Sequence, residues 1–263
     1  MNQPEIVKIE SIQNETDSIK TITFFYKLET IPGQFFMIWI PGIDEIPMSV
    51  SNINNDNKAI TFRVVGDATK SLFNLKKHDL IGIRGPYGNG FSFHGNHHLF
   101  IGGGTGIAMI APAVESCLLR DEPVDVILGA KTKDELFFIK RLQKTDANVH
   151  IATDDGSKGY KGYTSKLTEK IIKEKQIDTI YTCGPELMMK SIFEICIKNN
   201  ISLQASLERY MKCAVGICGQ CCIGEGLRVC IEGPIFSDKQ LLDISDFGVF
   251  NRNASGKKKN IQP

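Results

Sequence analysis

The sequence predicts a multidomain α+β protein: a six-stranded antiparallel β-barrel, an α/β unit with a parallel sheet, and a small C-terminal loop domain rich in cysteine. Short β-rich segments separated by turns fill the first 96 residues, and strand and helix patterns then alternate. Five of the eight cysteines fall between residues 213 and 230. We expect domains at 1–96, 97–205 and 206–240, and a tail at 241–263 whose last residues, 253–263, are polar and frayed.

Composition restricts the class of protein. Of 263 residues, 42% are hydrophobic and 23% charged, which is typical of a globular protein. The formal net charge of +1 argues against a protein that covers nucleic-acid phosphates. The longest apolar run, 35–40, is far shorter than the ~18 residues of a membrane helix, and the N-terminus has no signal-peptide pattern. We expect a cytoplasmic protein that binds neither nucleic acid nor membranes.

The first unit reads as strands and turns. Residues 19–26, 34–40 and 59–65 are β-rich, and Gly, Pro and Asn turns separate them. This spacing predicts a small antiparallel barrel. Taken alone, segments 46–50 and 63–70 are turns beside strands with a cationic neighbour, and they identify no ligand.

The second unit alternates between strands and helices. We expect strands at 99–101, 124–128, 149–152 and 178–182, and helices at 107–119, 133–143, 165–174 and 186–198. Pro112 implies that the first helix is kinked or starts later. The alternation predicts a parallel sheet with crossover helices.

Two strand-to-helix junctions in this unit are candidates for nucleotide binding. The first is the glycine run at 102–106, where the backbone can approach a phosphate at a helix N-terminus; a plain tight turn is the alternative. At the second, Gly184, Pro185 and Glu186 read as N-cap, N1 and N2 of a helix, which helix capping alone would explain. Cys183 precedes them at the carboxyl end of a strand, the edge where ligands bind in such sheets.

Three histidines, His94, His97 and His98, crowd one loop. No Asp, Glu or Cys lies close to them in the sequence, so a solvated loop is favoured over a metal site.

The cysteine-rich segment predicts an iron–sulfur cluster. Cys213-x4-Cys218-x2-Cys221 has the spacing of a plant-type [2Fe–2S] loop, with Cys230 as the fourth ligand. Cys222 is the spare, because adjacent side chains diverge. A four-cysteine zinc site usually shows two Cys-x2-Cys pairs, and only one is present. Plain buried thiols would not need the glycines that are interleaved here.

Together these pieces resemble the ferredoxin-reductase superfamily and, within it, the electron-transfer subunits of NAD-dependent (class 1B) dihydroorotate dehydrogenases. The supporting stretches are IRGPYGNG at 83–90, DDGS at 154–157 and RVCIEGP at 228–234, and the resemblance covers roughly 5–240. It implies FAD in the barrel, NAD on the second domain and [2Fe–2S] on Cys213, Cys218, Cys221 and Cys230. It also implies an FMN-containing catalytic subunit as partner, in a heterotetramer of two chains of each kind.

The resemblance assigns residues to each cofactor. For FAD they are Pro47, Met48, Ser49, Arg63, Val65, Gly66, Ala68 and Thr69. For NAD they are Gly102, Gly103, Gly104, Thr105, Gly106, Cys183, Gly184 and Pro185, with Cys183 near the nicotinamide.

The chain also departs from the family pattern. Ile46 stands where Arg is usual and Met48 where Tyr is common, so Arg63 or Lys70 would have to neutralise the flavin pyrophosphate. The interval from Cys221 to Cys230 is shorter than usual.

The implied chemistry is electron transfer in pyrimidine (UMP) synthesis. NADH carries a hydride, a [2Fe–2S] cluster carries one electron, and FAD can exchange both, so it must lie between them. Electrons would run from dihydroorotate through the cluster and FAD to NAD+. Two alternatives stay open: a similar reductase subunit of a soluble hydrogenase, anaerobic sulfite reductase or bifurcating transhydrogenase, and a non-catalytic redox sensor. NADP is also open, because Lys131 or Lys133 could meet a 2′-phosphate.

Overall fold

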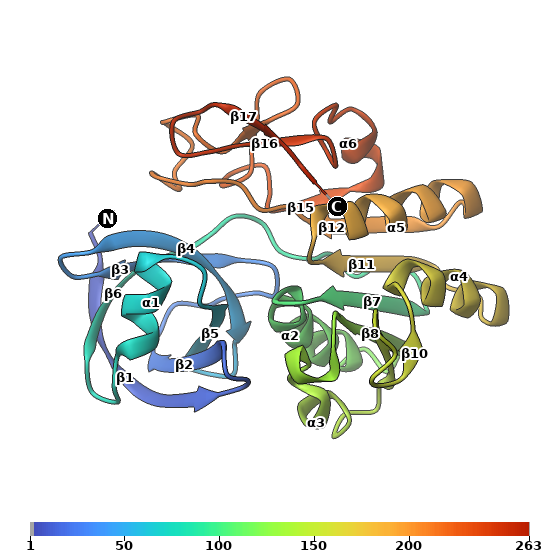
Figure 1. The fold of residues 1–263 in the computed structure, drawn as a ribbon, viewed down its shortest axis with the longest axis horizontal. Helices are drawn as coiled ribbons and strands as arrows, with labels where there is room; N and C mark the ends of the chain where they lie inside the picture. Colours follow the sequence, from blue (N-terminus) through green and yellow to red (C-terminus); the bar gives the residue numbers. More distant parts are fainter. Residues whose placement is uncertain (1–2, 263) are drawn as a thin grey trace.

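The structure is a computed structural model and describes residues 3–262. It confirms the predicted barrel: six antiparallel strands close in the order β1-β2-β5-β4-β3-β6 (Figure 1). Alternate residues such as Ile22, Phe24 and Ile60 are fully buried inside it, because side chains of a strand point to opposite faces. Its elements are β1 (Glu5–Asn14), β2 (Ile19–Phe25), β3 (Phe35–Ile40), β4 (Asp44–Asn52), β5 (Asn57–Arg63), α1 (Asp67–Asn74) and β6 (Leu80–Tyr87).

The predicted parallel sheet is also present. Its order is β10-β9-β8-β7-β11-β12-β15, and every pairing is parallel except β12 with β15. Helix α2 packs on one face, with Phe100 and Val126 beneath it, while α4 and α5 cover the other face over Leu99 and Ile101. The elements are β7 (His98–Gly103), α2 (Gly106–Leu118), β8 (Val124–Ala130), η1 (Lys133–Glu135), α3 (Ile139–Leu142), β9 (Asn148–Thr153), β10 (Tyr160–Lys161), α4 (Thr164–Glu174), β11 (Thr179–Cys183), α5 (Glu186–Asn199) and β12 (Ser202–Ser206).

Two local predictions in this unit were wrong, and a third is narrowed. The helix expected at 133–143 is a 3-10 turn and a short α3, interrupted at Phe138, whose φ of 58° is left-handed. Helix α2 starts at Gly106 and contains Pro112, which excludes the later start and leaves the kink as a prediction. Pro185 is the N-cap of α5 rather than its first helical residue. Strand β12 was not predicted.

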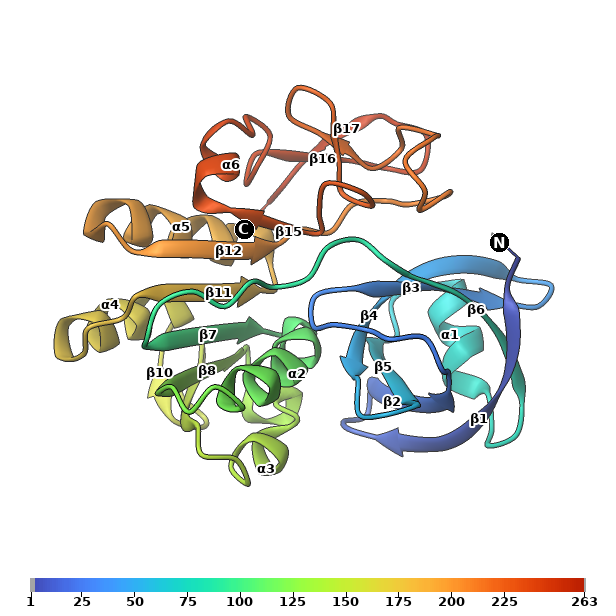
Figure 2. The ribbon, with the colours of Figure 1, turned by 180° about the vertical axis from the view of Figure 1, so that it is seen from behind.

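The cysteine-rich segment forms a lobe above the sheet (Figure 2), anchored by the pairing of β15 with β12. It contains β13 (Cys222–Ile223), β14 (Leu227–Arg228), β15 (Ile235–Ser237), α6 (Asp238–Leu242), β16 (Phe250–Arg252) and β17 (Lys258–Asn260). The tail is not frayed: β16 and β17 pair, and the Ile261 N–H donates to the Val249 carbonyl at 3.0 Å. The expectation for Pro263, like that for residues 1–2 of the barrel, lies outside the described residues. The domain limits at 96, 205 and 240 stay predictions.

Across residues 3–262, the helices are all too short or too polar to cross a membrane.

Candidate functional site

A cavity of about 310 Å³ separates the barrel from the carboxyl edge of the parallel sheet. Open α/β sheets bind ligands at this edge, because strand ends and helix N-termini converge there. The barrel supplies Phe35, Pro47, Met48, Ser49, Thr61, Phe62, Arg63, Val65 and Thr69 to the wall. The rest of the chain supplies Thr105, Gly106, Ala108, Met109, Cys183, Ser206, Leu207, Glu208, Arg209, Met211 and Pro234.

Six of the eight residues predicted for FAD line this cavity; Gly66 and Ala68 lie beside it but do not. Thr69 shapes the turn that leads into α1. Its hydroxyl accepts the N–H groups of Val65 and Gly66 at 2.9 and 3.0 Å, and donates to the Gly66 carbonyl at 2.9 Å. The first turn of α1, whose N–H groups lack helical partners, therefore begins at the cavity rim.

The two cations proposed for the pyrophosphate differ in position. Arg63 lines the cavity, and its Nη2 lies 2.9 Å from the Glu135 carboxylate. Lys70 is outside the lining, 64% exposed, and 3.6 Å from Asp67. Of the two, Arg63 is the one placed to meet an anionic ligand.

The two predicted strand-to-helix junctions lie against each other. A Cβ on Gly106 would meet the Cys183 carbonyl oxygen at 2.2 Å, and a Cβ on Gly184 would meet the Gly103 oxygen at 2.7 Å. These close approaches require glycine. Of the residues predicted for NAD, three line the cavity (Thr105, Gly106 and Cys183), and five do not (Gly102, Gly103, Gly104, Gly184 and Pro185).

Cys183 is 2% exposed. Burial, with a smaller contribution from the charge of Glu208, raises the pKa of its thiol far above the usual range. The thiol therefore stays protonated and can contact a ligand, but it is not a thiolate nucleophile.

Glu208 and Arg209 are cavity residues that the sequence did not reveal. Although Glu208 faces the cavity, the surrounding protein desolvates its carboxylate and raises its pKa; Glu186 adds to this shift and Arg209 opposes it. Arg209 is held by Glu186 at 2.7 and 3.0 Å. A prediction of strand β12 would have placed both residues at the cavity. They follow the carboxyl end of β12, at the same sheet edge as Cys183.

The cavity suits a polar ligand. The Arg209 side chain is only 3% exposed, and within the described residues its buried Nε lacks a hydrogen-bond partner. Buried donors are normally paired. An unpaired donor on a cavity wall, together with Arg63, therefore fits a dinucleotide cofactor that completes the bonding.

Beyond the cavity, the four predicted cluster ligands form two pairs of thiols. The Cys218 N–H donates to Cys213 Sγ at 3.4 Å, and the thiol of Cys221 contacts that of Cys230. Burial raises the pKa of Cys213, but N–H groups of Cys218, Val215 and Ile217 outweigh it and lower the pKa to about 6. Two thiol pairs and backbone donors aimed at sulfur fit a cluster with two irons.

Glycines give this loop its shape. Gly216 has φ 75°, and a Cβ there would meet Ile231 Cγ1 at 2.7 Å, while its carbonyl accepts Arg228 Nη1 at 2.8 Å. Burial and the neighbouring Cys221 raise the pKa of Cys230 to about 12, so it would have to lose its proton on binding iron. Cys222 lies on β13, opposite Arg228, outside both pairs.

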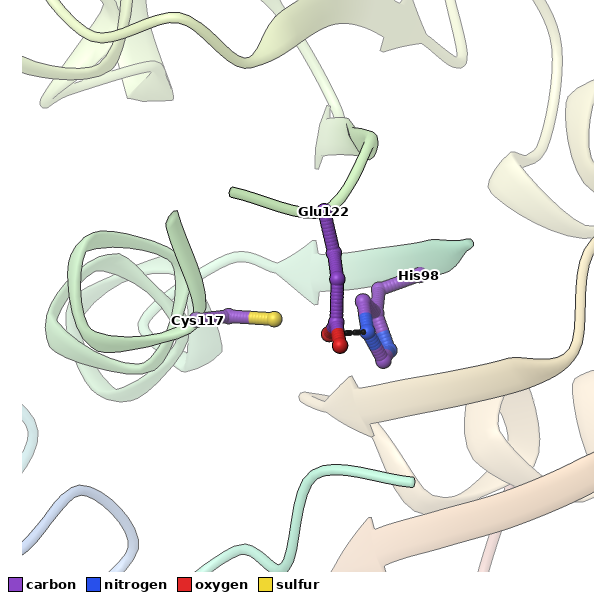
Figure 3. Close-up of side chains that lie close together, drawn as sticks. All are labelled: His98, Cys117 and Glu122. Atoms are coloured by element: carbon purple, nitrogen blue, oxygen red, sulfur yellow. Dashed lines mark hydrogen bonds and ion pairs between the residues drawn. The ribbon is translucent and has the colours of Figure 1, made fainter. Parts of the chain in front are cut away.

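A second group of potential metal ligands lies at the amino end of β7, away from the cavity: His98, Cys117 and Glu122 (Figure 3). The expected solvated histidine loop was wrong here, since His98 is fully buried and His97 Nε2 lies 2.8 Å from Asp125. Glu122 accepts bonds from Arg120 at 2.8 and 3.0 Å and from His98 at 2.6 Å. Arg120, followed by His98, lowers the pKa of Glu122 to about 2. Because a guanidinium occupies both carboxylate oxygens, the group is an ion-pair cluster rather than a metal site.

Comparison with known proteins matches the cysteine-rich lobe and the parallel-sheet unit to described domains. The sequence model for the "Iron-sulfur cluster binding domain of dihydroorotate dehydrogenase B" matches residues 208–242, and that for the "Oxidoreductase NAD-binding domain" matches 100–194. A solved structure titled "Insights into flavin-based electron bifurcation via the NADH-dependent reduced ferredoxin-NADP oxidoreductase structure" superimposes with a TM-score of 0.82 and 25% identity, covering 93% of this chain and 91% of that one.

Two relatives align with this protein over nearly its whole length. Both are named "Probable dihydroorotate dehydrogenase B (NAD(+)), electron transfer subunit". The protein from Methanocaldococcus jannaschii is 45% identical, over 98% of this chain and 99% of its own. The protein from Methanothermobacter thermautotrophicus is 42% identical, over 98% of both chains. The chain therefore belongs to the family of electron transfer subunits of dihydroorotate dehydrogenase B.

Proposed function

We propose that this protein is the electron-transfer subunit of a NAD+-linked dihydroorotate dehydrogenase of pyrimidine synthesis. It carries electrons from an FMN-containing catalytic subunit, which oxidises dihydroorotate to orotate, through [2Fe–2S] and FAD to NAD+. The assembly is a heterotetramer of two chains of each kind. The free thiols of Cys117, Cys183 and Cys196 favour the reducing cytoplasm as its location.

One observation carries this proposal: the cavity wall and the cluster loop are parts of one short segment. Glu208, Arg209 and Met211 line the cavity, and Cys213 follows within the same segment. A dinucleotide in the cavity and a cluster on the loop would therefore be neighbours. The 45% identity to a relative over 98% of this chain supports the same function.

When bound here, FAD would supply the chemistry that links hydride transfer at the nicotinamide to single-electron transfer at the cluster. The barrel residues Met48 and Ser49 line the cavity and would hold the flavin, and Arg63 and the first turn of α1 would hold the pyrophosphate. On the sheet side of the cavity, Gly106 and Cys183 would admit the nicotinamide, because the neutral thiol and the missing side chain leave an uncharged surface.

Glu208 has a separate task, which is to move a proton. A hydride contains two electrons and one proton, whereas a cluster delivers electrons alone, so each hydride formed requires a proton from another source. Glu208 is the only carboxylate among the residues that line the cavity, and burial raises its pKa. It therefore holds a proton in the pH range where other glutamates are ionised.

The cofactors can be tested on the purified protein. Anaerobic preparation should give flavin and iron–sulfur absorption, two irons and two sulfides per chain, and bleaching of the flavin by NADH. Flavin without iron would remove the cluster, and zinc without flavin would refute the whole proposal. Flavin and cluster that NADH does not bleach would favour a redox sensor. Activity only with a hydrogenase or sulfite reductase subunit would favour the other reductases.

A further inference from the structure

The interdomain connection, residues 88–97, links β6 of the barrel to β7 of the sheet and runs beneath the cysteine-rich lobe (Figure 2). One of its residues, Asn89, makes four hydrogen bonds to a short segment of that lobe. The Asn89 N–H donates to the Gly233 carbonyl at 2.7 Å. Its Nδ2 donates to the carbonyls of Glu232 and Ile235 at 3.0 and 2.9 Å, and its Oδ1 accepts the Ile235 N–H at 2.9 Å.

The bonded segment closes a turn around the fourth predicted cluster ligand, Cys230. The Glu232 N–H donates to the Arg228 carbonyl at 2.9 Å, and the Arg228 N–H donates to the Glu232 carboxylate at 2.6 Å. Cys230 lies between these two residues in the chain and is 1% exposed. Asn89 therefore holds one end of the turn that carries Cys230, and it does so from the end of the barrel.

The connection and this segment also approach each other closely. Gly88 has φ 75°, and a Cβ there would meet Pro234 Cδ at 2.5 Å and the Gly233 carbonyl oxygen at 2.9 Å. Pro234 lines the cavity, and its carbonyl accepts the Leu207 N–H at 2.9 Å. The bonds of Asn89 are thus made where the barrel, the cavity wall and the cysteine-rich lobe meet.

Burial does not account for Asn89, because this residue is exposed. An exposed amide can bond water at little cost, so its protein partners add little to stability. Three side-chain bonds to one segment do, however, fix both the position and the orientation of that segment. The hydrogen bonds of Asn89 therefore serve the placement of the Cys230 turn more than the stability of the fold.

We propose that Asn89 is a positioning residue for the iron–sulfur cluster, and that it fixes the turn carrying Cys230 relative to the barrel. This inference rests on the proposed function and adds a residue outside the cysteine motif to the cluster site. Groups that hydrogen-bond behind a metal ligand orient it, and their loss typically costs about 10–100-fold in metal affinity or activity. Without the Asn89 amide the Cys230 thiol remains, but its turn is free to shift.

The test compares Asn89→Ala with Gln204→Ala in the full-length holoprotein. Gln204 is a matched control, because its amide also holds the connection: it accepts the Ser92 N–H at 3.0 Å and donates to the Ser92 carbonyl, from β12. Iron release to a chelator should be about tenfold or more faster than wild type in Asn89→Ala, and within about twofold of wild type in Gln204→Ala. The EPR lines of the reduced cluster should shift in Asn89→Ala alone.

Asn89→Asp separates the hydrogen bonds from the shape of the side chain. It has nearly the same size and keeps the acceptor for the Ile235 N–H, but it loses the two bonds that Nδ2 donates. It should therefore release iron as fast as Asn89→Ala. Bleaching of the flavin by NADH should match wild type in all three variants, which shows that each is folded and binds its flavin.

Wild-type iron release and an unchanged EPR spectrum in Asn89→Ala would overturn the positioning role and leave the proposed function standing. Equally fast iron release from Gln204→Ala would also overturn it, because any loosening of the connection would then be enough. Absence of iron from the wild-type protein would instead overturn the proposed function.

Discussion

The guanidinium of Arg84 donates to the backbone carbonyl of Cys213 at 3.4 Å, so a barrel strand holds the first cysteine of the cluster loop. Glu45 fixes Arg84 with bonds of 2.7 and 2.6 Å, and the Tyr87 hydroxyl accepts another at 3.1 Å. Tyr87 in turn packs on Phe35, which lines the cavity, with ring centroids 5.9 Å apart. Packed side chains therefore connect the cavity wall to the cluster loop.

Arg84→Met should destabilise the protein and disturb the cluster. It leaves Glu45 unpaired in a largely buried position, and we expect a loss of about 2–3 kcal/mol in the free energy of unfolding. Urea unfolding measures this loss. The separate effect on the loop is measured by the EPR spectrum of the reduced cluster. The lines of this spectrum should broaden or shift. An unchanged spectrum would show that the Cys213 contact does not position the loop.

Cys218→Ser and Cys222→Ser form a matched pair of substitutions. The first removes a proposed ligand and should abolish most of the iron and sulfide, while flavin remains bound in the barrel. The second changes a thiol outside both pairs and should keep the full cluster. Iron and sulfide assays on anaerobically purified protein measure the cluster content of each variant. Loss of iron from Cys222→Ser alone would reassign the ligand set.

Glu208→Gln should slow the proton-dependent step. We expect reduction of NAD+ by dihydroorotate, measured with the catalytic subunit, to fall by about 10²-fold, since general acid–base catalysis is typically worth 10²–10⁴. Flavin reduction by NADH should change less than about twofold, because a hydride brings its own proton. The wild-type pH dependence that follows Glu208 should disappear. Stopped-flow absorbance across pH measures both. A variant that keeps the wild-type rate and profile would exclude Glu208 as the proton carrier.

The same substitution predicts a change in stability with a definite sign. Burial raises the pKa of Glu208 in the folded protein, so the folded state binds this proton more tightly than the unfolded state. Wild-type stability should therefore fall as pH rises from the unfolded pKa through the folded one. Relative to wild type, Glu208→Gln should have a higher Tm at pH 8 and little difference at pH 4. A constant difference would contradict the raised pKa of Glu208.

Glu122→Gln should show the opposite dependence. Arg120 and His98 lower the pKa of Glu122 to about 2. Its stabilising effect is therefore complete above the unfolded pKa and is lost as pH falls toward 2. Thermal unfolding should show a steady deficit for the variant from pH 7 to 5 that shrinks below pH 4. EDTA should leave Tm unchanged; a metal-dependent Tm would contradict the ion-pair assignment.

The order of the lobes was predictable because it rests on local patterns. Alternating apolar residues specify barrel strands, glycines mark the strand-to-helix junctions, and the spacing from Cys213 to Cys221 needs no tertiary information. Strand β12 was missed because Ser202–Ser206 is short and mixes polar with apolar residues, so its place in the sheet comes from pairing with β11.

The features that the sequence missed or predicted wrongly depend on contacts between distant residues. Glu208 and Arg209 reach the cavity only through the position of β12. His98 and His97 meet their acidic partners, Glu122 and Asp125, where the start of β7 lies beside the start of β8. The polar tail is ordered because Gln220 and Val249 bond to it. None of these pairings leaves a trace in local composition.

The most direct test of the account is reduction of NAD+ by dihydroorotate in a mixture of this protein and its catalytic subunit. We predict NADH formation only when both chains are present, with loss of NADH formation in Cys218→Ser while the catalytic subunit still oxidises dihydroorotate with an artificial acceptor. No NADH formation from a mixture in which both chains carry their cofactors would contradict the proposed function.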